Sequence, residues 1–197
     1  MHSGWGAMVA ISGSSKGPEL VDRKRMIIID PSIPGAKQPY HYAADLPFAD
    51  AHKHIEKCDA CSRALAFVAI RELRQNLQKR EYEIVGCAML LASSRSLPGL
   101  ADILKSHPLI HTAEGEFFRR VVSQACERVG IPVTGLSERE LDARATSEFG
   151  IKFARQIRTF DELGRSLGPP WTQDYKRAAL AASLVLQHKV PQHAKSR

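Results

Sequence analysis

The chain has 197 residues, 44% of them hydrophobic and 25% charged, so it is long enough to bury a core without disulfides. Its apolar runs are much shorter than the roughly 20 residues of a membrane-spanning helix, which excludes an integral helical membrane protein. The net charge of +7 comes from scattered basic residues, and we expect at most weak attraction to nucleic acid. The first residues lack a basic leader and a long apolar stretch, so we expect a cytoplasmic protein.

Two β-rich segments at the start of the sequence predict an antiparallel hairpin. Residues 6–12 are apolar, turn-forming residues follow, and residues 19–30 resume a β-rich pattern. Four prolines between residues 31 and 47 predict an ordered connector that is neither strand nor helix. Residues 48–79 carry apolar side chains at spacings of three and four, which predicts a long helix.

Short apolar strands alternate with helices in the rest of the sequence. Residues 82–93 are almost continuously apolar, as is typical of a central strand that is covered on both faces. A helical region over 98–129 follows, with a break or kink at Pro108, and Gly130 ends it. A strand is then expected at 131–137. The remaining helices are predicted at 138–149, 151–166 and 172–189.

The order of these elements resembles that of ribonuclease H-like domains. The resemblance implies one α/β domain over residues 1–197, with a mixed five-stranded sheet in which an antiparallel meander is continued by parallel strands and flanked by helices. In that order, strands 6–12 and 84–92 are paired neighbours in the centre of the sheet. The Holliday-junction resolvases of this superfamily further imply a metal-dependent phosphoesterase that acts on nucleic acid.

The acidic residues of that superfamily are matched at only one position. Asp174 lies near the start of the last predicted helix, where resolvases have an acid that helps to bind a divalent metal. The first strand lacks an aspartate and the strand at 84–92 lacks a glutamate, although both normally supply ligands. The chain is therefore either a variant phosphoesterase with other ligands, or a non-catalytic protein that binds a partner or associates with itself.

The segment HPLIHTAEGEFFRR, residues 107–120, places polar side chains on the apolar face of its predicted helix. At about 100° of rotation per residue, His107, His111 and Glu114 share a face with the apolar residues that follow. A carboxylate on such a face needs a partner, which can be a histidine, an arginine, a metal or a ligand. Two interpretations stay open: Glu114 and His111 tie the helix to a loop such as residues 38–43, or they form a ligand or catalytic site.

Two further features of this helix bear on packing. Gly115 costs the helix up to ~1 kcal/mol relative to alanine, which indicates that another group packs closely there. Glu116, Arg119 and Arg120 are expected to point away from the buried face.

The site residues that follow from these patterns come from three segments. The candidate catalytic residues are His111, Glu114 and Asp174. If the protein is a catalyst, we expect Mg²⁺ or Mn²⁺ held by Glu114 and Asp174, because these ions prefer oxygen ligands. The structural alternative for Asp174 is a role in capping its helix. Candidate ligand-binding residues are His41, His107, Glu116, Trp171 and Lys176.

The four cysteines, Cys58, Cys61, Cys87 and Cys126, lie in apolar periodic segments rather than in loops, so we expect reduced thiols. His54, Cys58 and Cys61 share one helical face, but their spacing differs from that of structural zinc sites, and we interpret them as packed side chains. The sequence also lacks the motifs of Walker-type nucleotide-binding proteins, serine hydrolases and HExxH metalloproteases.

Overall fold

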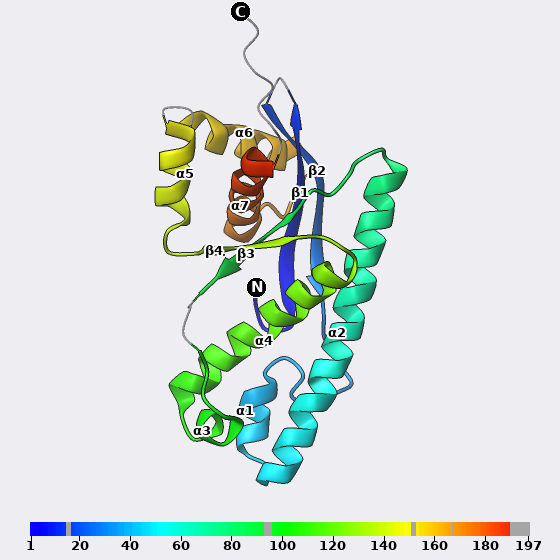
Figure 1. Ribbon diagram of the computed structural model, residues 1–197, viewed down its shortest axis with the longest axis vertical. Coiled ribbons are helices and arrows are strands. Elements are labelled where there is room, and N and C mark those ends of the chain that lie inside the picture. Colours follow the sequence, from blue (N-terminus) through cyan, green and yellow to red (C-terminus); the bar gives the residue numbers. More distant parts are fainter. Residues whose placement is uncertain (15–16, 93–95, 151–152, 167, 190–197) are drawn as a thin grey trace, which may run out of the picture.

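Helix α2 runs along much of the length of an elongated molecule, beside a β-hairpin and helix α4 (Figure 1). The structure, a computed structural model, describes residues 1–14, 17–92, 96–150, 153–166 and 168–189. Its elements in chain order are β1 (Trp5–Ser14), β2 (Gly17–Ile27), α1 (Pro39–Ala44), α2 (Phe48–Lys79), β3 (Cys87–Leu91), α3 (Leu100–Leu104), α4 (His107–Arg128), β4 (Val133–Ser137), α5 (Leu141–Phe149), α6 (Phe153–Ser166) and α7 (Gln173–Lys189).

The described strands form two small sheets. β1 and β2 make the predicted antiparallel hairpin, with Trp5 opposite Ile27 at its open end. β3 and β4 lie parallel, with Cys87 opposite Val133. A parallel pair needs a long crossover connection, and helices α3 and α4 provide it.

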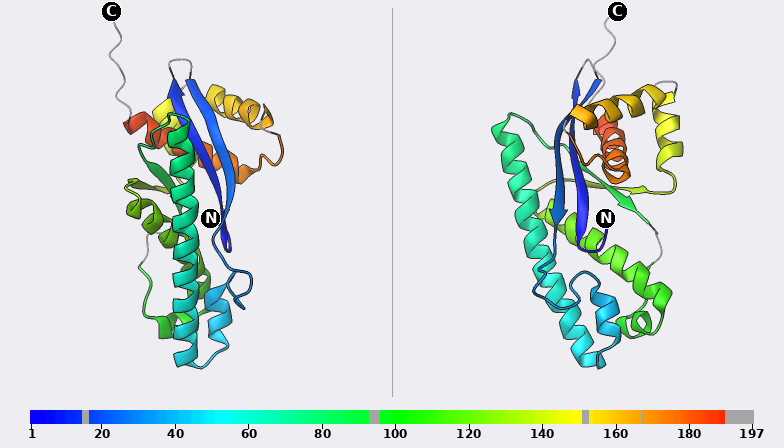
Figure 2. Two further views of the ribbon diagram at one scale, coloured as in Figure 1. Left: turned by 90° about the vertical axis from the view of Figure 1, so that its right-hand side faces the viewer. Right: turned by 180° about the vertical axis from the view of Figure 1, so that it is seen from behind.

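This topology contradicts the predicted five-stranded mixed sheet. Within the described residues, β1–β2 and β3–β4 are separate two-stranded sheets. Segments 6–12 and 84–92 are therefore not paired neighbours, and they line one cavity instead. The reason lies in how the apolar segment is covered. Helices α4 and α7 pack against β3, so that Met89 is buried and the other residues of the strand are partly buried, and no described strand lies on its second edge. The molecule is an α/β protein with helices packed around two small sheets (Figure 2).

One helical segment differs from the sequence prediction, and another agrees with it apart from the position of its break. The connector at 31–47 contains the short helix α1, which starts at Pro39, because the fixed φ and missing N–H of proline suit a first helical turn. The helical region 98–129 is interrupted, as predicted, but the break lies at residues 105–106, so that Pro108 lies in the first turn of α4. Gly130, with a φ of 76°, lies directly after the end of α4, as predicted.

The core has one main cluster and smaller ones around it. The main cluster packs α4 against α2 and the hairpin through residues such as Phe118, Val121 and Met26. Another joins α5 and α7 to β4 through Leu136 and Leu184. None of the helices in the described part of the chain has both the length and the apolar character needed to cross a membrane.

Candidate metal site

Three histidines from two helices meet at the end of the molecule that α1, α3 and the start of α4 form (Figure 1). One ligand atom from each of His41, His107 and His111 lies within 4.8 Å of the other two. The ring centroids of His107 and His111 are 4.4 Å apart, and those of His41 and His111 are 4.7 Å apart. No other group of three or more His, Cys, Asp or Glu side chains among the described residues is placed to share one metal ion.

The local sequence explains why these rings converge. Pro108 suits the first turn of α4, so the helix starts at His107, and a spacing of four residues puts His107 and His111 on one face. Pro39 starts α1 in the same way, and His41 follows in its first turn. His107 and His111 are exposed and His41 is half-buried, so the cluster is open to solvent on the α4 side.

Glu114 fixes the position of α1 against α4. Its Oε1 accepts hydrogen bonds from the backbone N–H groups of Tyr40, at 2.8 Å, and His41, at 3.1 Å. These N–H groups belong to the first turn of α1, where no intrahelical acceptor exists and where Gln38 provides no side-chain cap. A carboxylate at this end also interacts favourably with the helix dipole. Glu114 therefore acts as the N-terminal cap of α1 from another helix.

The same carboxylate contacts a histidine ring. Oε1 of Glu114 lies 3.3 Å from Nδ1 of His41. Burial raises the pKa of Glu114, although the hydrogen bonds from His41 and Tyr40 act in the opposite direction. Its Oε2 is buried and has no hydrogen-bond partner in the described part of the structure. A proton on Nδ1 that is donated to Oε1 leaves Nε2 of His41 with the lone pair that a metal requires.

Both interpretations of segment 107–120 therefore have a counterpart in the structure. Glu114 ties α4 to residues 38–43, as the structural interpretation predicts, and the histidines gather at the same point, as a ligand site requires. A Cβ atom on Gly115 would lie 2.7 Å from Nη1 of Arg119, so the predicted close packing is with a side chain of the same helix.

The expectation that Arg119 points away from the buried face is wrong. Arg119 is only 8% exposed, and its Nε donates a hydrogen bond to the carbonyl of Leu90 at 2.8 Å. A long side chain can bury its stem while its polar end reaches a strand carbonyl, which helical phase alone does not predict.

Asp174 lies at the start of α7, towards the other end of the molecule (Figure 1). Its Oδ1 is 2.9 Å from Nε2 of His2. Asp174 is in no group of described residues placed to hold a metal, and neither is Glu114. Glu114 contacts the start of α1 and Asp174 contacts His2, so the structure does not bring these two carboxylates together. The helices that carry them have different neighbours, because α4 starts beside α1 and α3 whereas α7 packs on α6 and β1.

The remaining predicted ligand-binding residues have structural contacts. Oε1 of Glu116 lies 4.0 Å from Nη1 of Arg119. Trp171 stacks on a tyrosine of α7 with 5.9 Å between ring centroids, and Nζ of Lys176 lies 2.8 Å from Oδ1 of Asp161. Trp171 and Lys176 therefore help to pack α6 on α7 and are not part of the histidine cluster.

The sequence predicted that His107 and His111 share one face of a helix, but it did not group them with His41. The spacing of His107 and His111 also matches the two histidines of an HExxH zinc helix, a signal that the prediction of Mg²⁺ or Mn²⁺ did not use. His41 could not be added to this pair from the sequence, since its position depends on the cap that Glu114 forms.

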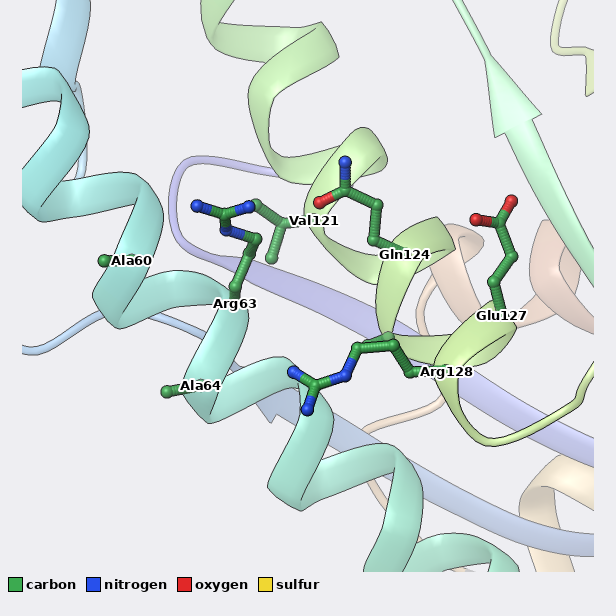
Figure 3. A pocket seen from close by; sticks show the side chains of 8 residues that line it. Ala60, Arg63, Ala64, Val121, Gln124, Glu127 and Arg128 are labelled. Atoms are coloured by element: carbon green, nitrogen blue, oxygen red, sulfur yellow. The ribbon is translucent and has the colours of Figure 1, made fainter.

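A groove of about 700 Å³ between α2 and α4 is a second surface feature (Figure 3). Arg63 and Arg128 line it together with alanine side chains. Nη2 of Arg63 is 2.7 Å from Oδ2 of Asp59, and the guanidinium of Arg128 lies over the ring of Phe67. Both arginines are thus already engaged, and the groove is a weaker candidate for anion binding than the histidine cluster is for a metal.

No family model matches this sequence, and comparisons with curated proteins and with solved structures gave no match either. The order of elements is the only observation behind the ribonuclease H-like resemblance. The function has to be argued from the geometry of the site.

Proposed function

We propose that this protein binds one zinc ion through His41, His107 and His111. The observation that carries the proposal is the convergence of three imidazole nitrogens within 4.8 Å of one another. Imidazole is a ligand of zinc and related transition metals, whereas Mg²⁺ and Mn²⁺ favour oxygen. Zn–N bonds are about 2.0 to 2.1 Å long, so binding requires the rings to close slightly around the ion. The exposed His107 and His111 are free to make this adjustment.

The contact between Glu114 and His41 supports the proposal. Histidines that bind zinc commonly donate their second ring N–H to a carboxylate, which orients the ring and increases its basicity. Glu114 lies at this position, 3.3 Å from Nδ1 of His41, and its backbone hydrogen bonds prevent it from moving away. A carboxylate that only capped α1 would not need to contact the ring.

Three protein ligands leave a fourth position for water, as in catalytic zinc sites. Zinc lowers the pKa of a bound water to about 7, which provides a nucleophile at neutral pH. We therefore propose hydrolysis of a phosphoester as the reaction, and the net charge of +7 favours a polyanionic substrate such as nucleic acid. Nucleic acid and a second copy of the chain remain predicted partners, and the cytoplasmic location remains a prediction.

Zinc titration of metal-free protein by calorimetry tests the binding step. We expect one equivalent of zinc per chain, and a loss of affinity of at least about 100-fold in His111→Ala because a direct ligand is removed. The matched control is His52→Ala, which removes an exposed histidine of α2 that lies 3.4 Å from Glu56. Equal zinc affinity in both variants would refute the site.

Hydrolysis of bis(p-nitrophenyl) phosphate tests the reaction separately. The zinc-loaded protein should hydrolyse this substrate faster than His111→Ala under the same conditions, and His52→Ala should match the wild type. If one zinc ion binds but the wild type is no faster than His111→Ala, the metal is structural and the proposed reaction is wrong.

A further inference from the structure

Two cysteines meet at the cavity between the two sheets, away from the histidine cluster. Cys87 is the first residue of β3, and Cys126 lies in the last turn of α4. Both line a cavity of about 410 Å³, and Cys87 packs against the core cluster to which Cys126 belongs. In the sequence both resemble ordinary core residues, so this pair is visible only in the structure.

The backbone around these cysteines explains why they meet. After α4 the chain turns at Gly130, which has a φ of 76°, and β4 then runs beside β3. The N–H of Cys87 donates to the carbonyl of Pro132 at 2.8 Å, and the N–H of Ile131 donates to the carbonyl of Cys126 at 2.9 Å. The same short turn therefore anchors both cysteines through main-chain hydrogen bonds.

We propose that Cys87 and Cys126 form a reversible disulfide by exchange with a low-molecular-weight disulfide that enters this cavity. Cys126 is only 1% exposed, so a reagent can reach it only from the cavity side. The walls are mainly apolar, with residues such as Ile70 and Leu90, and the exposed His2 also lines the cavity, which therefore reaches the surface. A volume of this size lies within the range of about 300 to 1,000 Å³ that small-molecule sites occupy.

The two thiols have different roles in the exchange. Cys87 is half-buried whereas Cys126 is buried, so Cys87 is the thiol that a small disulfide reaches first. The interaction between the two thiols also lowers the pKa of Cys87 and raises that of Cys126, which makes Cys87 the attacking thiolate. It attacks one sulfur of the small disulfide RSSR and forms a mixed disulfide, and the leaving RS⁻ takes up a proton. Cys126 then loses its proton and attacks the sulfur of Cys87, and the second RS⁻ leaves and is protonated. The protein loses two hydrogens, and RSSR becomes two RSH.

The other two cysteines provide an internal comparison. Cys58 and Cys61 lie on α2, and neither lines the cavity. Burial raises the pKa of Cys58 to about 11, so this thiol stays protonated at neutral pH. Cys61 is half-buried and shows how far a thiol outside the cavity reacts under the same conditions.

The test uses the reduced full-length chain and 2-hydroxyethyl disulfide, a small neutral probe. After incubation, alkylation of the remaining thiols and mass spectrometry of the peptides, we expect the loss of two of the four thiols. Cys87 and Cys126 should appear in one linked peptide pair, which dithiothreitol separates. In Cys126→Ser the reaction should stop at a mixed disulfide on Cys87, and Cys61→Ser should behave like the wild type.

Two results would overturn the proposal. One is the retention of both thiols at Cys87 and Cys126 while Cys61 becomes modified. The other is a cross-link that includes Cys58 or Cys61. The peptide map of the wild type alone distinguishes these outcomes, so the test does not depend on whether Cys126→Ser folds.

Discussion

The two ends of the molecule differ in how completely their interiors are filled. At the end formed by α1, α3 and the start of α4, small side chains such as Ala43, Ala51 and Ala113 are at most 1% exposed, and a buried carboxylate fixes one helix on another. At the other end, the hairpin, β3 and α7 surround a cavity of about 410 Å³. A metal site needs ligands held by packed neighbours, whereas entry of a small molecule needs open volume. The packed end carries the proposed metal site, and the open cavity carries the two cysteines of the proposed disulfide.

The largest difference in stability between the two ends is expected when a large side chain is replaced by a small one. Phe117 is 2% exposed and packs edge-on against Tyr40 of α1, with 6.1 Å between ring centroids. Phe117→Ala should lower the free energy of unfolding by about 3 to 5 kcal/mol, because it leaves a new cavity in packed surroundings. Met8 in β1 is only half-buried and borders the existing cavity, so Met8→Ala should cost less than half as much. Urea denaturation of both variants measures this, and equal losses would remove the distinction between the two ends.

Small-to-large substitutions should change stability in opposite directions at the two ends. Ala113 and Ala181 are each 1% exposed and lie within helices, but only Ala181 lines the cavity. Ala113→Val should cost about 1 to 3 kcal/mol through overpacking, whereas Ala181→Val should be neutral or gain up to about 1 kcal/mol by filling space. Both changes carry the same helix-propensity penalty, so each controls for the other in thermal denaturation. A loss of similar size in both variants would mean that the cavity does not accept added volume.

A small change in stability is expected for Glu114→Gln, which separates capping from metal binding. The amide oxygen can still accept the N–H groups of Tyr40 and His41, so the free energy of unfolding should change by less than about 1 kcal/mol. Glu114→Ala removes the acceptor and should cost about 1 to 3 kcal/mol. The neutral amide orients His41 less strongly, so zinc affinity in Glu114→Gln should fall about 10- to 100-fold. Unchanged zinc affinity would restrict Glu114 to the cap.

Local residue patterns predicted most of the helices and strands. They did not predict which of these elements pair or pack with one another. The hairpin, the long helix at 48–79 and the termination at Gly130 follow from residue types and spacing, and the structure confirms them. The pairing partner of 84–92 does not follow from its composition. The apolar side chains of such a segment can be covered equally well by another strand or by helices such as α4 and α7. That error led to the prediction of one sheet.

At the histidine cluster, too, features that depend on local sequence were predictable, and those that depend on distant segments were not. The burial of Glu114, at 8% exposure, follows from its place on the apolar face of α4. The convergence of His41 with His107 does not, since it depends on contacts between segments about 70 residues apart. Asp174 was assigned from its place in a fold with one mixed sheet, and the described strands form two separate sheets instead.

The contact between β1 and α7 has a consequence for how this protein is made. β1 lies at one end of the described sequence and α7 at the other, and the two pack against each other. β2 follows β1 directly and pairs with it, but in a nascent chain the part of β1 that packs on α7 stays uncovered until α7 has been synthesised. β1 contains no charged residue and no proline, which are the features that discourage strands from pairing with other chains, whereas β2 carries Asp22, Arg23, Lys24 and Arg25. During translation β1 thus lacks these protective features, and the packing of helix α7 on β1 covers it.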